Sequence, residues 1–101
     1  MFTYHNMNIK KYQKESKKTE MKFKNNREKL LFLALGLSEE AGELDHAVKV
    51  FLKTKKSREK IKDSLGDILW YIAEFSNNFD WTIEYIASNN RSKLKKRYHE
   101  K

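Results

Sequence analysis

The chain contains no proline and only three glycines among its 101 residues, so little in it interrupts a helix. Proline and glycine are the residues that most strongly end helices and mark turns. Residue patterns typical of strands are scarce, whereas leucine, lysine, glutamate and isoleucine supply helix-forming and core-filling side chains. The sequence therefore predicts an all-α fold.

Apolar residues recur at mixed steps of three and four and divide the chain into four predicted helices. These helices cover residues 8–19, 27–53, 58–77 and 81–98. The basic connection 53–57 is short, and Ser57 is suited to cap the helix that follows it. Because a short connection makes neighbouring helices antiparallel, we expect the second and third helices to form a hairpin.

A chain of this length predicts one domain, spanning residues 1–101, with room for only a small core. Its helices carry more apolar surface than they can cover alone. We therefore expect a four-helix bundle completed by association into a homodimer or homotetramer. No run approaches the roughly 20 apolar residues of a membrane span. The absence of cysteine fits a reducing compartment, and we expect a cytoplasmic protein.

Basic residues outnumber acidic residues by 22 to 14, which gives a formal net charge of +8. The excess gathers in residues 10–29, 49–62 and 91–101. Such a surface suits a polyanion, and it is equally typical of solvated lysines that maintain solubility. Nucleic acid is not the expected partner, because inward-facing carboxylates would repel a phosphate backbone and no helix-turn-helix pattern is present.

Two acidic clusters lie inside apolar helical runs, where carboxylates are costly. Glu39-Glu40-x-x-Glu43 falls within one arc of the second predicted helix, and Asp63-Ser64-x-x-Asp67 repeats that arc on the third. The hairpin would bring the two clusters together. Carboxylates crowded in this way repel one another unless a cation lies between them. Oxygen ligands without cysteine favour Mg²⁺ or Mn²⁺ over zinc, whereas the alternative is a solvated acidic face.

These residues also resemble a known family. Residues 35–44 resemble the first motif of the MazG-like all-α nucleoside triphosphate pyrophosphohydrolases, and residues 65–71 resemble the second. The tail Asn90-x-x-Lys93-Leu94-x-x-Arg97 is similar to the closing positions of the family, and Tyr12-Gln13 to its usual first helix. The resemblance covers nearly the whole chain in order.

The resemblance implies Mg²⁺-dependent hydrolysis of a nucleoside triphosphate to the monophosphate and pyrophosphate, in sanitation or regulation of the nucleotide pool. It implies that Glu40, Glu43 and Asp67 are metal ligands. Glu39 would help to hold a second ion or would orient the attacking water, so Glu39 and Glu40 are the candidate catalytic residues. Asn90, Lys93 and, more weakly, Arg97 would contact the nucleotide.

Ser64 departs from the family pattern, which has glutamate at this position. A hydroxyl is a weaker ligand than a carboxylate, so the cage lacks one negative charge. Asp63 lies next to it and shares a helix face with Asp67, so it is a candidate substitute ligand. Ser64 could equally ligate through water. The alternative reading is a catalytically weakened MazG-like module that binds nucleotides or nucleic acid through its basic surface.

The phosphates of the substrate would also need cations, because the chain has no glycine-rich phosphate loop. Neutralising phosphate oxygens and stabilising the leaving group are the main demands of phosphoanhydride hydrolysis. Lys49, Lys53 and Lys93 are the candidates to meet the departing pyrophosphate. For Lys49 the alternative is a solvated lysine at the end of an amphipathic helix.

Overall fold

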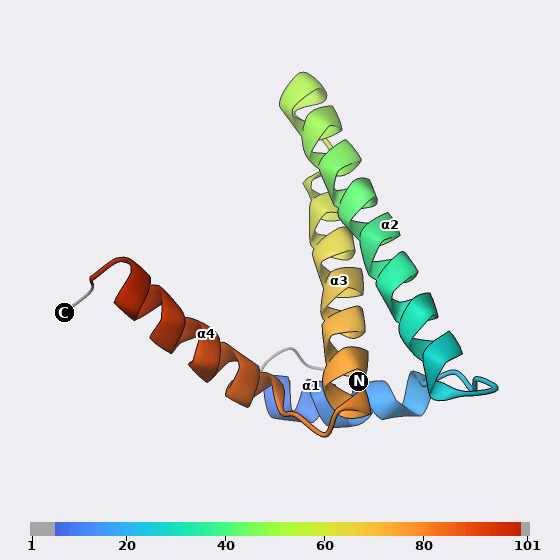
Figure 1. Ribbon diagram of the computed structural model, residues 1–101. Coiled ribbons are helices and arrows are strands. Elements are labelled where there is room, and N and C mark those ends of the chain that lie inside the picture. Colours follow the sequence, from blue (N-terminus) through green and yellow to red (C-terminus); the bar gives the residue numbers. More distant parts are fainter. Residues whose placement is uncertain (1–5, 100–101) are drawn as a thin grey trace.

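The computed structural model describes residues 6–99, which contain four α-helices, one short 3-10 helix and no strand (Figure 1). The elements in chain order are α1 (Ile9–Ser16), η2 (Lys17–Thr19), α2 (Asn26–Thr54), α3 (Arg58–Asn78) and α4 (Ile83–Arg97). The predicted all-α class is confirmed. None of the described helices is both long and apolar enough to cross a membrane.

The helices α2 and α3 form an antiparallel hairpin that makes the most extensive contact in the fold. Figure 1 shows α1 crossing the base of this hairpin, where α2 begins and α3 ends. The helix α4 contacts α1 and α3 and then extends away from the hairpin. The arrangement is open, with a radius of gyration of 16.1 Å against about 13 Å for a compact domain of this length.

Side chains cap three of the four α-helices. Asn8, Asn25 and Thr82 each accept a hydrogen bond from the backbone N–H three residues later, as good N-cap residues do. Ser57 occupies the corresponding position of α3 but makes no side-chain cap, so that prediction was wrong. Its backbone is left-handed, at φ 69°, which is unsuited to capping geometry.

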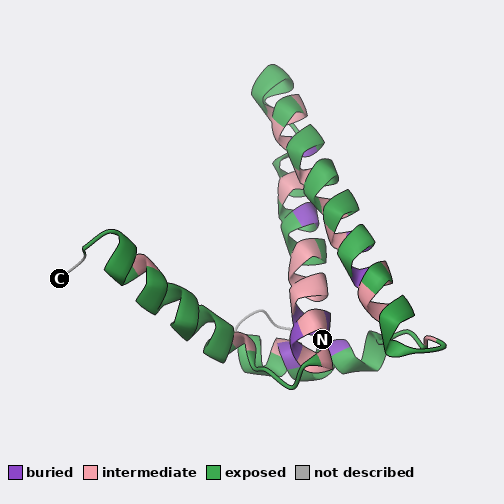
Figure 2. Cartoon of the chain, in the orientation of Figure 1, coloured by how far each residue is buried: buried purple, intermediate pink, exposed green. Residues whose placement is uncertain are grey.

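The buried apolar core is small, because each helix of the hairpin is covered on one side only (Figure 2). Its buried apolar residues, among those that the structure describes, are Leu33, Ala47 and Ala73. The apolar spacing of the sequence predicts that Leu31 and Leu65 face inward, but each is 52% exposed, so this prediction was wrong. Sequence periodicity identifies an apolar stripe but does not say which part of a wide stripe a neighbour will cover.

A close contact between α2 and α3 occurs at Gly36. A Cβ atom at this position would lie 2.3 Å from the Tyr71 hydroxyl, so the ring of Tyr71 packs directly on the α2 backbone. Because glycine inside a helix is costly, the sequence also predicts a close backbone approach at Gly42 and Gly66, beside the acidic clusters. Nothing lies within 4 Å of a Cβ built at either residue, so this expectation is wrong for the single chain.

Gln13 joins α1 to the turn between α3 and α4. Its side-chain N–H groups donate to the Asn77 carboxamide oxygen at 2.9 Å and to the Trp81 carbonyl at 2.8 Å. The oxygen of its side-chain amide accepts a hydrogen bond from the Ile83 N–H at 2.9 Å, at the first turn of α4. Because Gln13 is buried, these bonds fix the start of α4 against α1.

Gln13→Leu should therefore lower the free energy of unfolding by about 2 to 3 kcal/mol, because it leaves buried donors and acceptors unpaired. Urea unfolding followed by circular dichroism measures the effect. The matched control is Lys14→Leu on the exposed side of the same helix, which should change stability by less than about 0.5 kcal/mol. Equal stability of the two variants would contradict this role for Gln13.

Candidate active site

Two carboxylates from different helices meet in the middle of the hairpin. Glu40 projects from α2, and Asp67 projects from α3 to within hydrogen-bonding reach of it. Burial raises the pKa of Glu40, and the negative charges of Asp67, Glu43 and Glu39 raise it further. The hairpin has thus brought together the two acidic segments in a place where their charges repel.

The remaining acidic residues of the two clusters lie around this pair. Glu39 and Glu43 act on Glu40 electrostatically, and both are exposed. Ser64 is buried on the inner face of α3, three residues before Asp67. Asp63 is exposed, so the position facing α2 in this turn belongs to Ser64.

Two tyrosines border the carboxylate pair. Burial raises the pKa of Tyr71, and the charges of Glu40, Glu39 and Asp67 raise it further, so its phenol stays protonated and can donate a hydrogen bond. Burial and the carboxylates of Asp67 and Glu74 raise the pKa of Tyr12 in α1. The charge of the acidic site therefore acts on phenol groups of both α1 and α3.

Within residues 6–99, no group of three or more histidine, aspartate or glutamate side chains is close enough together to hold a metal ion. The pair Glu40–Asp67 supplies two facing carboxylates. Glu43 lies one turn after Glu40 on α2. Closing a cage would require the side chains of Glu39 or Glu43 to turn towards the pair, and both are free to do so because they are exposed.

The predicted phosphate-binding residues do not gather at this pair within one chain. Lys49 is exposed and pairs with Asp45 at 3.0 Å, and Lys53 is exposed near the end of α2. Asn90 and Lys93 line a cavity of about 320 Å³ on α4 beside Trp81. Arg97 is the last residue of α4, which extends away from the hairpin (Figure 1).

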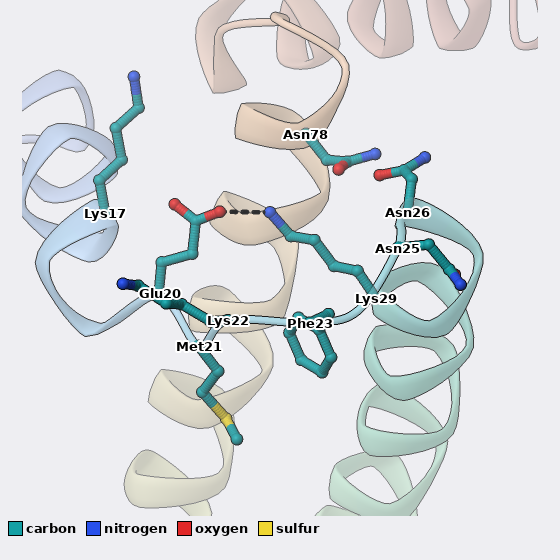
Figure 3. A pocket seen from close by; sticks show the side chains of 9 residues that line it. All are labelled: Lys17, Glu20, Met21, Lys22, Phe23, Asn25, Asn26, Lys29 and Asn78. Carbon is teal, nitrogen blue, oxygen red and sulfur yellow. Dashed lines mark hydrogen bonds and ion pairs between the residues drawn. The ribbon is translucent and has the colours of Figure 1, made fainter.

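A larger cavity, of about 620 Å³, lies where the segment between η2 and α2 passes the end of α3. Figure 3 shows the ion pair between Glu20 and Lys29 inside it, with Phe23 forming part of the wall. The Lys29 side chain is only 13% exposed and is paired with this carboxylate. No site residue predicted from the sequence lines this cavity.

Glu74 is a buried carboxylate that the sequence analysis missed. It is 1% exposed, and its Oε2 atom has no hydrogen-bond partner. Burial raises its pKa, Glu20 raises it further, and Lys29 opposes the shift together with hydrogen bonds from Asn77 and Ser16. Its position within an apolar run of α3 was the available signal, as it was for the other acidic residues.

A helical hairpin that holds facing carboxylates is the kind of fold and site expected of a metal-dependent all-α hydrolase. Comparison with known sequences identifies the family. Residues 28–100 match the family described as the MazG nucleotide pyrophosphohydrolase domain. The chain belongs to this family. It is also 33% identical over 76 residues to the Gene 37 protein of Mycobacterium phage L5, which covers 69% of this chain and 67% of that protein. No solved structure matched.

Proposed function

We propose that this protein hydrolyses a nucleoside triphosphate to its monophosphate and pyrophosphate, using Mg²⁺ or Mn²⁺. The observation that carries the proposal is the approach of Glu40 and Asp67 across the hairpin, where the charge of Asp67 adds to burial in raising the pKa of Glu40. Membership of the pyrophosphohydrolase family supports it. The cytoplasmic nucleotide pool would supply the substrate.

The donor set fits a hard cation, because it consists of carboxylate oxygens from two helices that otherwise repel. Glu40, Glu43 and Asp67 are the proposed ligands, and Asp63, one helical turn before Asp67 on α3, is a further candidate. When bound, the metal would neutralise phosphate oxygens and acidify a coordinated water.

The chain's own residues would supply the remaining requirements. Glu39 is exposed next to the pair and would accept a proton from the attacking water. The protonated phenol of Tyr71 would donate a hydrogen bond to a phosphate oxygen. Lys49, Lys53, Asn90, Lys93 and Arg97 are the proposed contacts to the phosphates and the sugar.

Incubation of the purified protein with each common ribonucleoside and deoxyribonucleoside triphosphate in Mg²⁺, followed by a pyrophosphate assay, tests the proposal. Release of pyrophosphate and monophosphate in equal amounts is expected for at least one base. Release of orthophosphate instead, or of neither product, would contradict it.

We propose further that the protein acts as a homodimer or homotetramer. The single chain exposes 8551 Å², whereas a compact monomer of this mass exposes roughly 6,100 Å². Leu31 and Leu35 lie one turn apart on the uncovered side of α2, and α4 has no buried residue. Association would cover these surfaces, and it would allow Lys93 of one subunit to approach the carboxylates of the other.

Sedimentation equilibrium at about 20 micromolar should therefore give the mass of a dimer or tetramer. Leu35→Lys should shift the population towards monomer, because it places a charge within an apolar contact. Lys24→Leu, an exposed position away from this face, is a control that should leave the mass unchanged. A folded wild-type monomer at this concentration would overturn the proposal.

Ser64→Glu should tighten Mg²⁺ binding by about tenfold, or about 1.4 kcal/mol, the scale of an added interaction with a charged group. Ser64 is buried whereas Asp63 is exposed, which favours restoration of a missing ligand over crowding of a complete cage. Ser64→Gln is the matched control, because it adds the same bulk without charge. Calorimetry with Mg²⁺ measures both variants, and equal affinity in the two would contradict the expectation.

A further inference from the structure

The end of the hairpin formed by the last turns of α2 and the first turn of α3 carries positive charge that the proposed function leaves largely unused. Seven basic residues and one acidic residue, Glu59, lie within residues 49–62, which we call the basic tip. The basic residues are Lys49, Lys53, Lys55, Lys56, Arg58, Lys60 and Lys62, all of them exposed. The tip therefore carries six of the eight net positive charges of the chain.

Few of these charges are neutralised within the chain. Lys49 pairs with Asp45, and Lys62 and Arg58 both face Glu59. Among residues 6–99, no acidic partner lies within ion-pair distance of Lys55, Lys56 or Lys60. A set of uncompensated cations on one projection of the molecule attracts a polyanion.

The outer part of the tip, residues 53–58, is well separated from the carboxylate pair. Along α2, thirteen residues from Glu40 to Lys53 correspond to about 20 Å, and along α3, nine residues from Arg58 to Asp67 correspond to about 14 Å. The Debye length at physiological ionic strength is about 8 Å. The repulsion that argued against a nucleic-acid partner is therefore screened at this outer part of the tip.

The backbone holds the tip in a tight turn. Lys55 and Ser57 both adopt left-handed conformations, at φ 60° and 69°, which residues other than glycine rarely do. The Lys55 N–H donates to the Phe51 carbonyl at 2.7 Å, and the Lys56 N–H donates to the Thr54 hydroxyl at 3.1 Å. The lysines thus project from an ordered turn, which lowers the entropy lost when they bind.

The side chains of the tip indicate which kind of polyanion it can bind: single-stranded nucleic acid, a membrane surface or a duplex. Its residues include a single aromatic, Phe51, which is half-buried, so the stacking surface that single-stranded nucleic acid requires is missing. Leu52 is its one exposed large apolar side chain, whereas membrane-surface helices insert a whole apolar face. Figure 1 shows the tip projecting away from α1 and α4, so a rod-shaped partner could lie against it.

We propose that the basic tip binds the phosphate backbone of double-stranded nucleic acid without selecting a sequence. Lysine contacts to phosphates carry no information about bases, and six of the seven cations of the tip are lysines. Lys55, Lys56 and Lys60, which have no acidic partner among the described residues, take no part in the proposed hydrolysis. It would hold the protein on a polymer while its carboxylate pair remains exposed to solution.

The test is fluorescence anisotropy of a labelled 30-base-pair DNA duplex titrated with the full chain at several salt concentrations. The tip variant carries Lys55→Gln, Lys56→Gln and Lys60→Gln. If each lysine contacts one phosphate, the slope of log K against log salt should become shallower by about 2.7. The matched control, Lys10→Gln with Lys22→Gln and Lys24→Gln, removes the same charge from exposed sites elsewhere and should keep most of the slope.

Both variants should retain the wild-type circular dichroism spectrum, because the replaced side chains are exposed. Equal losses in the two variants would overturn the proposal, since the effect would then belong to net charge alone. Absence of wild-type binding at 50 mM salt would also overturn it. So would tighter binding to single-stranded DNA, or binding to phosphatidylserine vesicles in preference to the duplex. Glu40→Gln should bind duplex like the wild type, whatever its hydrolytic activity.

Discussion

Glu40→Gln should reduce the rate of pyrophosphate release by at least about 100-fold. The substitution removes one of the two carboxylates that face each other across the hairpin, while it keeps the size of the side chain. Losses of this size are typical when a charge-stabilising group is removed from an active site. Turnover measured in Mg²⁺ with the preferred triphosphate, together with calorimetric titration by Mn²⁺, gives the two readouts.

The fold should survive this change. Burial and the neighbouring carboxylates already disfavour the charged form of Glu40, so a neutral side chain should not destabilise the hairpin. Asp45→Asn is the control on the same helix, because it removes an exposed carboxylate whose pair with Lys49 contributes little stability. If Glu40→Gln bound Mn²⁺ as tightly as the wild type does, the carboxylate pair would not be part of the metal site, and the proposal would be wrong.

The helices were predictable from the sequence because their causes are local. Apolar periodicity and the absence of proline define α2 and α3 to within one residue of the observed ends. The meeting of Glu40 with Asp67 was predictable for a similar reason. A short connection forces an antiparallel hairpin, and the spacing of the two clusters along it then brings them level.

Features that depend on tertiary packing were not predictable. The direction of α4 depends on a turn in which Asp80 adopts a left-handed φ of 58° and on the hydrogen bonds of Gln13. The burial of Glu74 depends on how α1 and the segment after η2 cover α3. Neither arrangement produces a periodic pattern in the sequence, because each depends on contacts between residues that are far apart in the chain.

Glu74→Gln should stabilise the protein at neutral pH by about 1 to 3 kcal/mol, the scale of an unpaired polar group in a buried position. Burial and the charge of Glu20 raise the pKa of Glu74 in the folded state above its ordinary value of 4.5. A carboxyl whose pKa is raised by folding favours the folded state while it is protonated. That contribution is lost as the pH rises through the folded-state pKa, and the glutamine variant avoids the loss.

Urea unfolding at pH 4 and at pH 7.5 separates this charge effect from a packing effect. The two proteins should have nearly equal stability at pH 4, where Glu74 is largely protonated in both states, and the variant should be more stable at pH 7.5. Glu84→Gln, at an exposed position in the first turn of α4, should stabilise at neither pH. If the variant were less stable than the wild type at pH 7.5, the attraction between Lys29 and the Glu74 carboxylate would outweigh the free-energy cost of burying that charge. The carboxylate would then be a stabilising partner of that lysine.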